Sequence, residues 1–263
     1  MARADARGPV VRHPGGRVTV HFIGAGPGAA DLLTLRAARL IGECPVCVYA
    51  GALVPPEVLE HAPPDARLVD TQDLDLDAIV AELAAAHERG ENLARLQSGD
   101  LSIYSAVAEQ ARRLDKLCIP WDMTPGVPAF GAVAATLGRE LTLPGVAQTV
   151  ILTRYGKHAS KIPDGEDLGS LAAHGATLVI HLGAAAIAEI VATLTPCYGA
   201  ECPVAVVAHA SRADEVVLRG TLASIADRVE EEGVRRSATI VVGPAVAERD
   251  FAESHLYSKG RAR

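Results

Sequence analysis

Three glycine-containing segments have the residue types best suited to binding a small molecule. They are Gly24–Gly28 (GAGPG), Gln97–Asp100 (QSGD) and Thr124–Pro128 (TPGVP). Each follows a short run typical of a β-strand and precedes a stretch with helical spacing. Because the carboxyl ends of parallel strands meet at one edge of a sheet, where ligands bind, we expect the three segments to face one cleft.

The first segment matches the dinucleotide-binding fingerprint G-x-G-x-x-G/A, so an NAD(P)-dependent oxidoreductase is one alternative. Two features argue against it. The next expected strand ends at Tyr49 without an acidic residue to hold the ribose, and Pro27 has no N–H to offer a pyrophosphate. A tight turn that binds nothing is a second alternative, and a binding protein without catalytic activity is a third.

Asp100 is the one acidic residue within the three segments. Its carboxylate could accept a proton, bind polar groups of a ligand or cap the helix that follows. The GxSxG and HExxH motifs of hydrolases do not occur, and we expect no protein-bound metal. Cys44 and Cys47 have the spacing of a redox pair, but they fall between a helix and a strand, so we interpret them as buried thiols.

Alternating strands and helices must position the three segments in the first half of the chain. The spacing predicts strands at 18–23, 46–49, 67–69, 92–96 and 119–123, and helices at 31–42, 76–89, 104–117 and 128–137. Asp31 is the expected cap of the first helix. This order is typical of a mainly parallel sheet covered by helices on both faces, so the expected fold class is α/β.

The second half has its own elements after a boundary expected at 138–144. Strands are predicted at 149–153, 177–182, 204–208, 216–219 and 239–242, and helices at 185–194 and 222–231. Consecutive strands after Val204 indicate a mixed sheet with an antiparallel hairpin. We therefore expect domains at 17–140 and 141–247, with flexible tails at 1–16 and 248–263.

Composition excludes several classes of function. The net charge is −7 and only 3% of residues are aromatic, so we expect no nucleic-acid partner. The uncharged stretches, among them 123–138 and 175–188, are too short to span a membrane. The start of the chain lacks the apolar core of a signal peptide, and five cysteines fit a reducing compartment. We expect a cytoplasmic protein.

In this order the segments resemble the tetrapyrrole (precorrin) methyltransferase family, whose pattern is GxGPG, then xGD, then PGV or PGI. Here these are Gly24–Gly28, Ser98–Asp100 and Pro125–Val127. The stretches Glu140–Arg154 (ELTLPGVAQTVILTR) and Tyr49–Val54 (YAGALV) are similar to the subgroup that methylates C-11 of precorrin-4. The resemblance covers roughly residues 18–245. Relatives acting on another precorrin position, on uroporphyrinogen or on diphthine are the nearest alternatives.

The resemblance implies two α/β domains with an S-adenosylmethionine cleft between them, methyl transfer in cobalamin biosynthesis, and a homodimer. It carries a cofactor-binding role to Pro27, Ser98, Gly99, Asp100, Ile103, Pro128, Ala129, Leu182 and Ala210. Asp100 is also the candidate catalytic residue, since a proton must leave the methylated carbon. Many relatives have Asp directly after GxGPG, where this chain has Ala29, and GDP where it has Gly99–Leu101. The first departure removes that carboxylate from the loop.

A tetrapyrrole substrate carries many carboxylates, so an acidic protein must concentrate positive charge where the substrate binds. Arg154, Lys157, His158 and Lys161 follow the expected strand 149–153, in a chain with four lysines and 21 arginines. We expect these residues to bind substrate carboxylates, with a solvated loop as the alternative. His181 and His209 lie on apolar strands, where a core histidine is the default expectation.

Overall fold

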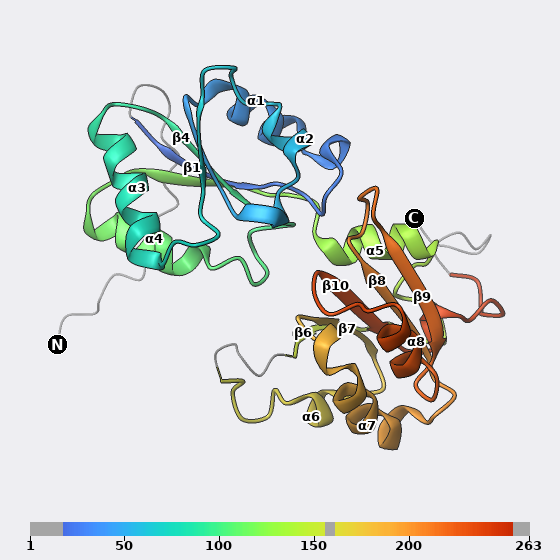
Figure 1. Ribbon diagram of the computed structural model, residues 1–263. Coiled ribbons are helices and arrows are strands. Elements are labelled where there is room, and N and C mark those ends of the chain that lie inside the picture. The colour runs from blue at the N-terminus through green and yellow to red at the C-terminus, as the bar shows by residue number, and fades with distance from the viewer. Residues whose placement is uncertain (1–17, 156–160, 255–263) are drawn as a thin grey trace, which may run out of the picture. The chain divides into compact units, whose positions relative to one another are not determined.

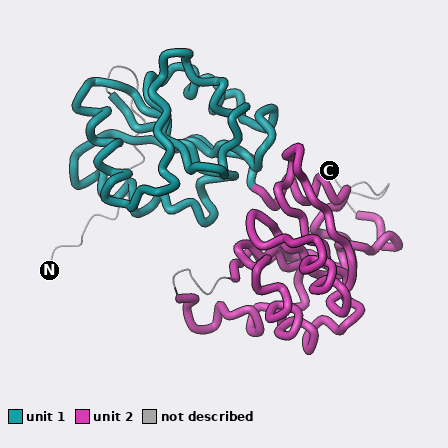
Figure 2. The backbone as a smooth tube through the Cα atoms, in the orientation of Figure 1, with its two compact units in different colours: residues 1–128 teal, residues 129–263 magenta. Residues whose placement is uncertain are grey.

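The computed structural model describes residues 18–155 and 161–254, which belong to two compact units (Figure 1). Figure 2 colours the two units, which divide between Pro128 and Ala129. The division lies before the boundary expected at 138–144, because the helix over Ala129–Leu137 packs into the core of the second unit. Of the helices described, none is both long and apolar enough to cross a membrane.

The first unit is a parallel five-stranded sheet in the order β3-β2-β4-β1-β5. The strands are β1 (Val20–Gly24), β2 (Val46–Tyr49), β3 (Arg67–Asp70), β4 (Leu93–Gln97) and β5 (Trp121–Thr124). The helices are α1 (Leu35–Glu43), α2 (Pro56–Leu59), α3 (Leu76–Glu88) and α4 (Val107–Lys116). The predicted parallel sheet is confirmed. The short helix α2 was not predicted, because four residues are too few for periodicity to reveal.

Helices cover both faces of this sheet because the apolar side chains of each strand alternate between two cores. Val20 and Phe22 of β1 pack with α3 and α4, whereas Ile23 packs with α1 and α2. Cys44 and Cys47 lie in the core that Ile23 forms with α1 and α2, where burial raises the pKa of each thiol to about 12. Both are free thiols, and the interpretation as buried, unreactive cysteines is supported.

Helix α1 begins at Leu35, and the prediction that Asp31 caps it was wrong. Its cap is Thr34, whose side chain accepts a hydrogen bond from the Ala37 N–H at 3.1 Å. A separate 3-10 turn over Ala30–Leu32 comes first. The spacing of the leucines fits either start, so periodicity alone does not locate the first turn.

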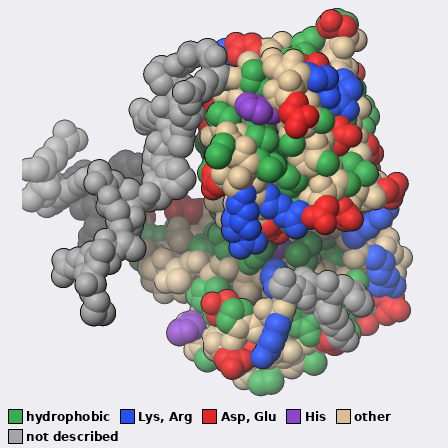
Figure 3. All heavy atoms as spheres, turned by 90° about the vertical axis from the view of Figure 1, so that its left-hand side faces the viewer, with side chains coloured by type: hydrophobic (Ala, Val, Ile, Leu, Met, Phe, Trp, Pro, Cys, Tyr) green, Lys and Arg blue, Asp and Glu red, His purple; other side chains and the backbone are tan. Residues whose placement is uncertain are grey.

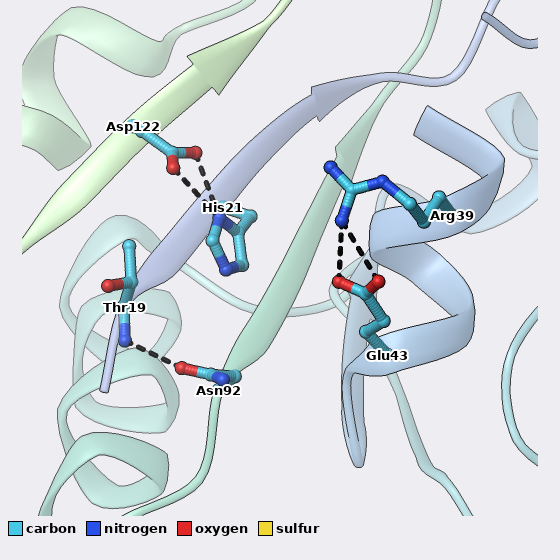
Figure 4. A network of polar contacts seen from close by, with 6 residues as sticks. All are labelled: Thr19, His21, Arg39, Glu43, Asn92 and Asp122. Atoms are coloured by element: carbon cyan, nitrogen blue, oxygen red, sulfur yellow. Dashed lines mark hydrogen bonds and ion pairs between the residues drawn. The ribbon is translucent and has the colours of Figure 1, made fainter. Parts of the chain in front are cut away.

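Polar contacts join the strands of the first unit's sheet, and one ion pair lies within helix α1. Nδ1 of His21 lies 2.9 and 3.0 Å from the two carboxylate oxygens of Asp122, its neighbour in the β1–β5 register (Figure 4). In the same view, the Thr19 N–H donates to Asn92 at 2.9 Å. Arg39 pairs with Glu43 one turn along α1. The strand contacts lie towards the amino ends of the strands, whereas the glycine segments follow the carboxyl ends.

The second unit is a mixed five-stranded sheet in the order β6-β7-β10-β8-β9. The strands are β6 (Val150–Arg154), β7 (Thr177–His181), β8 (Pro203–Ala208), β9 (Val216–Thr221) and β10 (Ala238–Val242). The helices are α5 (Ala129–Leu137), α6 (Leu168–Ala172), α7 (Ile187–Tyr198) and α8 (Ile225–Glu231). β8 and β9 form the predicted antiparallel hairpin. One core joins the sheet to α5, and the other joins it to α6, α7 and α8.

Candidate functional site

The three glycine segments of the first unit meet at one point, which we call the glycine junction (Gly24, Gly26, Gly99 and Gly126). Gly26 and Gly99 form an antiparallel bridge. The Gly26 nitrogen lies 3.2 Å from the Gly99 oxygen, and the Gly99 nitrogen lies 2.7 Å from the Gly26 oxygen. A Cβ atom on Gly24 would lie 2.5 Å from the Gly126 nitrogen. One on Gly126 would lie 2.2 Å from the Gly99 oxygen. Backbone therefore fills the space of a side chain, and the three segments meet as expected, while a ligand cleft beside them stays a prediction.

Asp100 ties the second segment to the third. Its Oδ2 accepts from the Gly126 N–H at 2.9 Å, and its Oδ1 accepts from the Ser102 N–H at 2.9 Å and from the Ser102 hydroxyl. Burial raises the pKa of Asp100, but these hydrogen bonds outweigh burial and leave the pKa below its ordinary value. A carboxylate that is ionised and already hydrogen-bonded is a weak base, so the geometry favours a positioning role for Asp100.

The loop between Asp100 and α4 contains two residues in the left-handed region, where non-glycine residues are uncommon. Tyr104 has φ 53° and Ala106 has φ 56°. Such conformations persist where the surroundings fix them, and they cluster at binding sites. Ile103 is half-buried in this loop and Tyr104 is 49% exposed. The loop therefore offers apolar and aromatic groups next to the glycine junction.

The other predicted cofactor residues near the junction lie in the three glycine segments or directly after them. Pro27 and Ser98 are half-buried, and Gly99 is buried. Pro128 is the last residue of the third segment and of the first unit, and Ala129 is the first residue of the second unit. The expectation that the cofactor binds between the two units stays a prediction.

In the second unit, β7 and β8 end at the sheet edge where β10 begins. Leu182, His209 and Ser237 at this edge all have left-handed φ angles, of 56°, 50° and 53°. Leu182 is 63% exposed, whereas Ala210 is 7% exposed and its methyl group packs in the core beside α5. Of the two predicted contacts here, Leu182 presents its side chain to solvent and Ala210 does not.

Carboxylates hold the turn that carries Ala210. Asp214 lies 2.8 Å from Nδ1 of His209 and 3.0 Å from Nε of Arg212. Glu215 accepts from the Ser211 N–H at 2.7 Å and, in α5, from the Thr136 hydroxyl at 3.0 Å. His209 therefore belongs to a half-exposed turn, and the expectation of a core histidine was wrong for it, because it follows the end of β8. His181 closes β7, and burial lowers its pKa.

The structure describes two of the four residues expected to bind substrate. Arg154 ends β6 opposite His181 and is half-buried, whereas the Lys161 side chain is 88% exposed and lies 3.8 Å from Asp164. Lys157 and His158 lie outside the described residues. On the face drawn in Figure 3, acidic and basic side chains are interspersed, so positive charge for an acidic ligand has to be concentrated locally.

Sequence reasoning missed two buried polar residues beneath the loop 101–106. Arg95 of β4 is 3% exposed and Gln110 of α4 is 2% exposed, and they are hydrogen-bonded to each other at 3.1 Å. A charged residue inside the apolar run Leu93–Leu96 was the available signal. Within residues 18–155 and 161–254, no three His, Cys, Asp or Glu side chains gather in a way that could hold a metal.

The geometry of the first segment disfavours the dinucleotide alternative. In that fingerprint the glycine loop opens directly into a helix whose amino end faces the pyrophosphate. Here the 3-10 turn Ala30–Leu32 intervenes and α1 begins only at Leu35. β2 is followed by Ala50 and Gly51, so no acidic side chain stands directly after that strand.

Comparison with known proteins identifies the family. The family "Tetrapyrrole (Corrin/Porphyrin) Methylases" matches residues 19–226. A precorrin-4 C(11)-methyltransferase of a Sinorhizobium species is 56% identical over 94% of this chain and 97% of its own length.

Two solved structures are similar along most of the chain. A cobalt precorrin-4 methyltransferase has a TM-score of 0.84 and 30% identity, covering 88% of this chain and 96% of its own. A uroporphyrin-III C-methyl transferase of Thermus thermophilus complexed with S-adenyl homocysteine has a TM-score of 0.73 and 29% identity, covering 89% and 96%. With the family match spanning most of the described residues, this chain belongs to the tetrapyrrole (corrin/porphyrin) methylases.

Proposed function

We propose that this protein is an S-adenosylmethionine-dependent methyltransferase that methylates C-11 of precorrin-4, or of its cobalt form, in cobalamin biosynthesis. The observation that carries the proposal is the glycine junction, in which the GxGPG, xGD and PGV segments interlock through their backbones. The choice of substrate is supported by 56% identity to a precorrin-4 C(11)-methyltransferase.

The residues in and around the glycine junction fit the methionine and ribose portions of this cofactor. Backbone crowding at Gly24 and Gly126 leaves main-chain groups and small side chains around the junction. In the proposed complex the contacting residues are Pro27, Ser98, Gly99, Asp100, Ile103, Pro128 and Ala129. When bound, the cofactor supplies an electrophilic methyl group on a sulfonium centre.

The residues of the second unit fit an apolar, planar base. Leu182 holds an exposed aliphatic side chain in a strained conformation at a sheet edge, which is the behaviour expected of a ligand contact. Ala210 lies on a turn fixed by Asp214 and Glu215, so its backbone is available in a set position. We assign both residues to the adenine.

The chain contributes to methyl transfer mainly by orienting the reactants and excluding water. Asp100 keeps the second and third segments in register through its bonds to Ser102 and Gly126, and it stays ionised while doing so. Arg154, Lys157, His158 and Lys161 are proposed to bind carboxylates of the tetrapyrrole. The reaction proposed needs no protein-bound metal, and the proposed enzyme is a cytoplasmic homodimer, as the family resemblance implies.

The test of this function is the product formed from a donor with an isotope-labelled methyl group. Precorrin-4, cobalt-precorrin-4, uroporphyrinogen and a diphthine-bearing protein are offered separately, and the product is examined by mass spectrometry and NMR. The proposal predicts one labelled methyl group at C-11 of one or both precorrin-4 forms. Labelling at another ring position, or only of uroporphyrinogen or diphthine, would contradict it.

A further inference from the structure

Arg95 is a buried cation whose partners are neutral. It lies in the central strand β4 and is 3% exposed, and burial lowers its pKa to about 10, so it remains protonated at neutral pH. Its Nε donates to Gln110 Oε1 at 3.1 Å and its Nη1 donates to Thr71 Oγ1 at 3.2 Å. In the part of the chain that the structure describes, no carboxylate pairs with it. Burying such a charge is costly, so it calls for a compensating role.

Gln110 connects this cation to the strained loop. Because its Oε1 accepts from Arg95, its Nε2 faces the other way and donates to the Ala106 carbonyl at 2.9 Å. Ala106 has a left-handed conformation and directly precedes α4, and its own side chain provides no capping hydrogen bond. The amide of Gln110 therefore anchors the end of the loop 101–106 to the buried guanidinium.

Thr71 anchors the same guanidinium on its other side. The Thr71 hydroxyl donates to the Tyr49 carbonyl at 2.9 Å, at the end of β2, and Thr71 is 7% exposed. The guanidinium thus bridges the carboxyl end of the sheet and the first turn of α4. A planar group with donors in a fixed fork suits this bridge better than the single ammonium of lysine.

We propose that Arg95 and Gln110 are positioning residues that hold the loop 98–106 in its ligand-binding form before the ligand arrives. Without the Gln110 bond, Ala106 loses a restraint on its left-handed conformation, and the loop that contains Ser98, Asp100 and Ile103 relaxes from its end at α4. Ligand binding then has to restore the loop conformation, which lowers affinity. The ligand part of this inference rests on the proposed function.

The test uses Gln110→Leu, which keeps the volume of the side chain and removes both hydrogen bonds. The matched control is Thr177→Val in the second unit, where the Thr177 hydroxyl donates to the Leu141 carbonyl at 2.9 Å and the residue is fully buried. Gln110→Leu loses two hydrogen bonds and Thr177→Val loses one, but only Gln110 contacts the loop. Arg95→Lys and Arg95→Met form a second pair, in which lysine is expected to rescue part of the effect.

The readouts are amide hydrogen exchange of residues 101–106 without ligand, and the Kd of S-adenosylhomocysteine by calorimetry. For folded Gln110→Leu we expect exchange and Kd each to rise about tenfold, with neither changing in Thr177→Val. Unchanged exchange in folded Gln110→Leu would overturn the inference, whatever the ligand does. If Gln110→Leu does not fold, Arg95→Met decides by the same exchange measurement: exchange should rise in Arg95→Met and less so in Arg95→Lys, and unchanged exchange in Arg95→Met would overturn the inference. If the proposed function itself is wrong, the wild-type protein will not bind S-adenosylhomocysteine, which is a separate result from the exchange measurement.

Discussion

At Gly126 a single methyl group is enough to test the glycine junction. In Gly126→Ala the new Cβ would meet the Gly99 oxygen at 2.2 Å and the Gly24 backbone at 2.7 Å, so the segments must separate. We expect a loss of stability of about 1–3 kcal/mol and loss of S-adenosylhomocysteine binding. Thermal unfolding measures the loss of stability, and calorimetry measures the loss of binding.

Gly138→Ala is the control for this substitution. Unlike Gly126, Gly138 has a positive φ, of 62°, and a Cβ there meets nothing within 4 Å. Backbone strain of about 1 kcal/mol is expected, with ligand affinity unchanged. Wild-type affinity in Gly126→Ala would show that the junction is not needed for binding.

The lowered pKa of Asp100 leads to a prediction about the effect of pH on stability and ligand binding. Because its pKa in the folded protein is lowered, its stabilising effect is present above the unfolded pKa of about 3.9 and is lost as pH falls through the folded pKa. Asp100→Ala is expected to raise the Kd of S-adenosylhomocysteine about tenfold, and wild-type affinity should be level between about pH 6 and 8. A rate that falls as Asp100 becomes protonated near neutral pH would instead make it the proton acceptor.

Strands and the longer helices were predictable from periodicity, and the residues that end them were not. The alternation in the first half predicted the parallel sheet, and the consecutive strands after Val204 predicted the hairpin β8–β9. Both carboxylate and hydroxyl side chains cap helices, so the sequence does not distinguish Asp31 from Thr34 as the cap of α1. The left-handed conformations of Tyr104 and Leu182 depend on tertiary contacts, and neither residue type signals them.

The polar loop after β6 carries a prediction about the substrate alone. The Lys161 side chain is 88% exposed, so reversing its charge disturbs no core contact. Lys161→Glu is expected to raise the KM for the tetrapyrrole about threefold and to leave cofactor affinity unchanged. Lys116→Glu, at the exposed end of α4, is the matched charge reversal and should leave both unchanged. An equal KM in the two variants would remove Lys161 from the substrate site.

Across the whole molecule, the sequence predicted candidate site residues in both units but did not reveal the buried polar groups beside them. Gly24, Gly99 and Gly126 were found because the three segments share one position relative to their strands. Arg95 and Gln110 were not found, since their pairing joins a strand to a helix and no local pattern encodes it. The net charge of −7 excluded broad basic surfaces, but the distribution of charge near a substrate is a property of the folded chain.

The central claim is that the glycine junction belongs to a site for a sulfur-bearing nucleoside. The most direct measurement is calorimetric titration of the wild-type protein with S-adenosylhomocysteine and, separately, with NAD(P). We expect a Kd for S-adenosylhomocysteine in the micromolar range, with no binding of either dinucleotide. Binding of NAD(P) without binding of S-adenosylhomocysteine would contradict it.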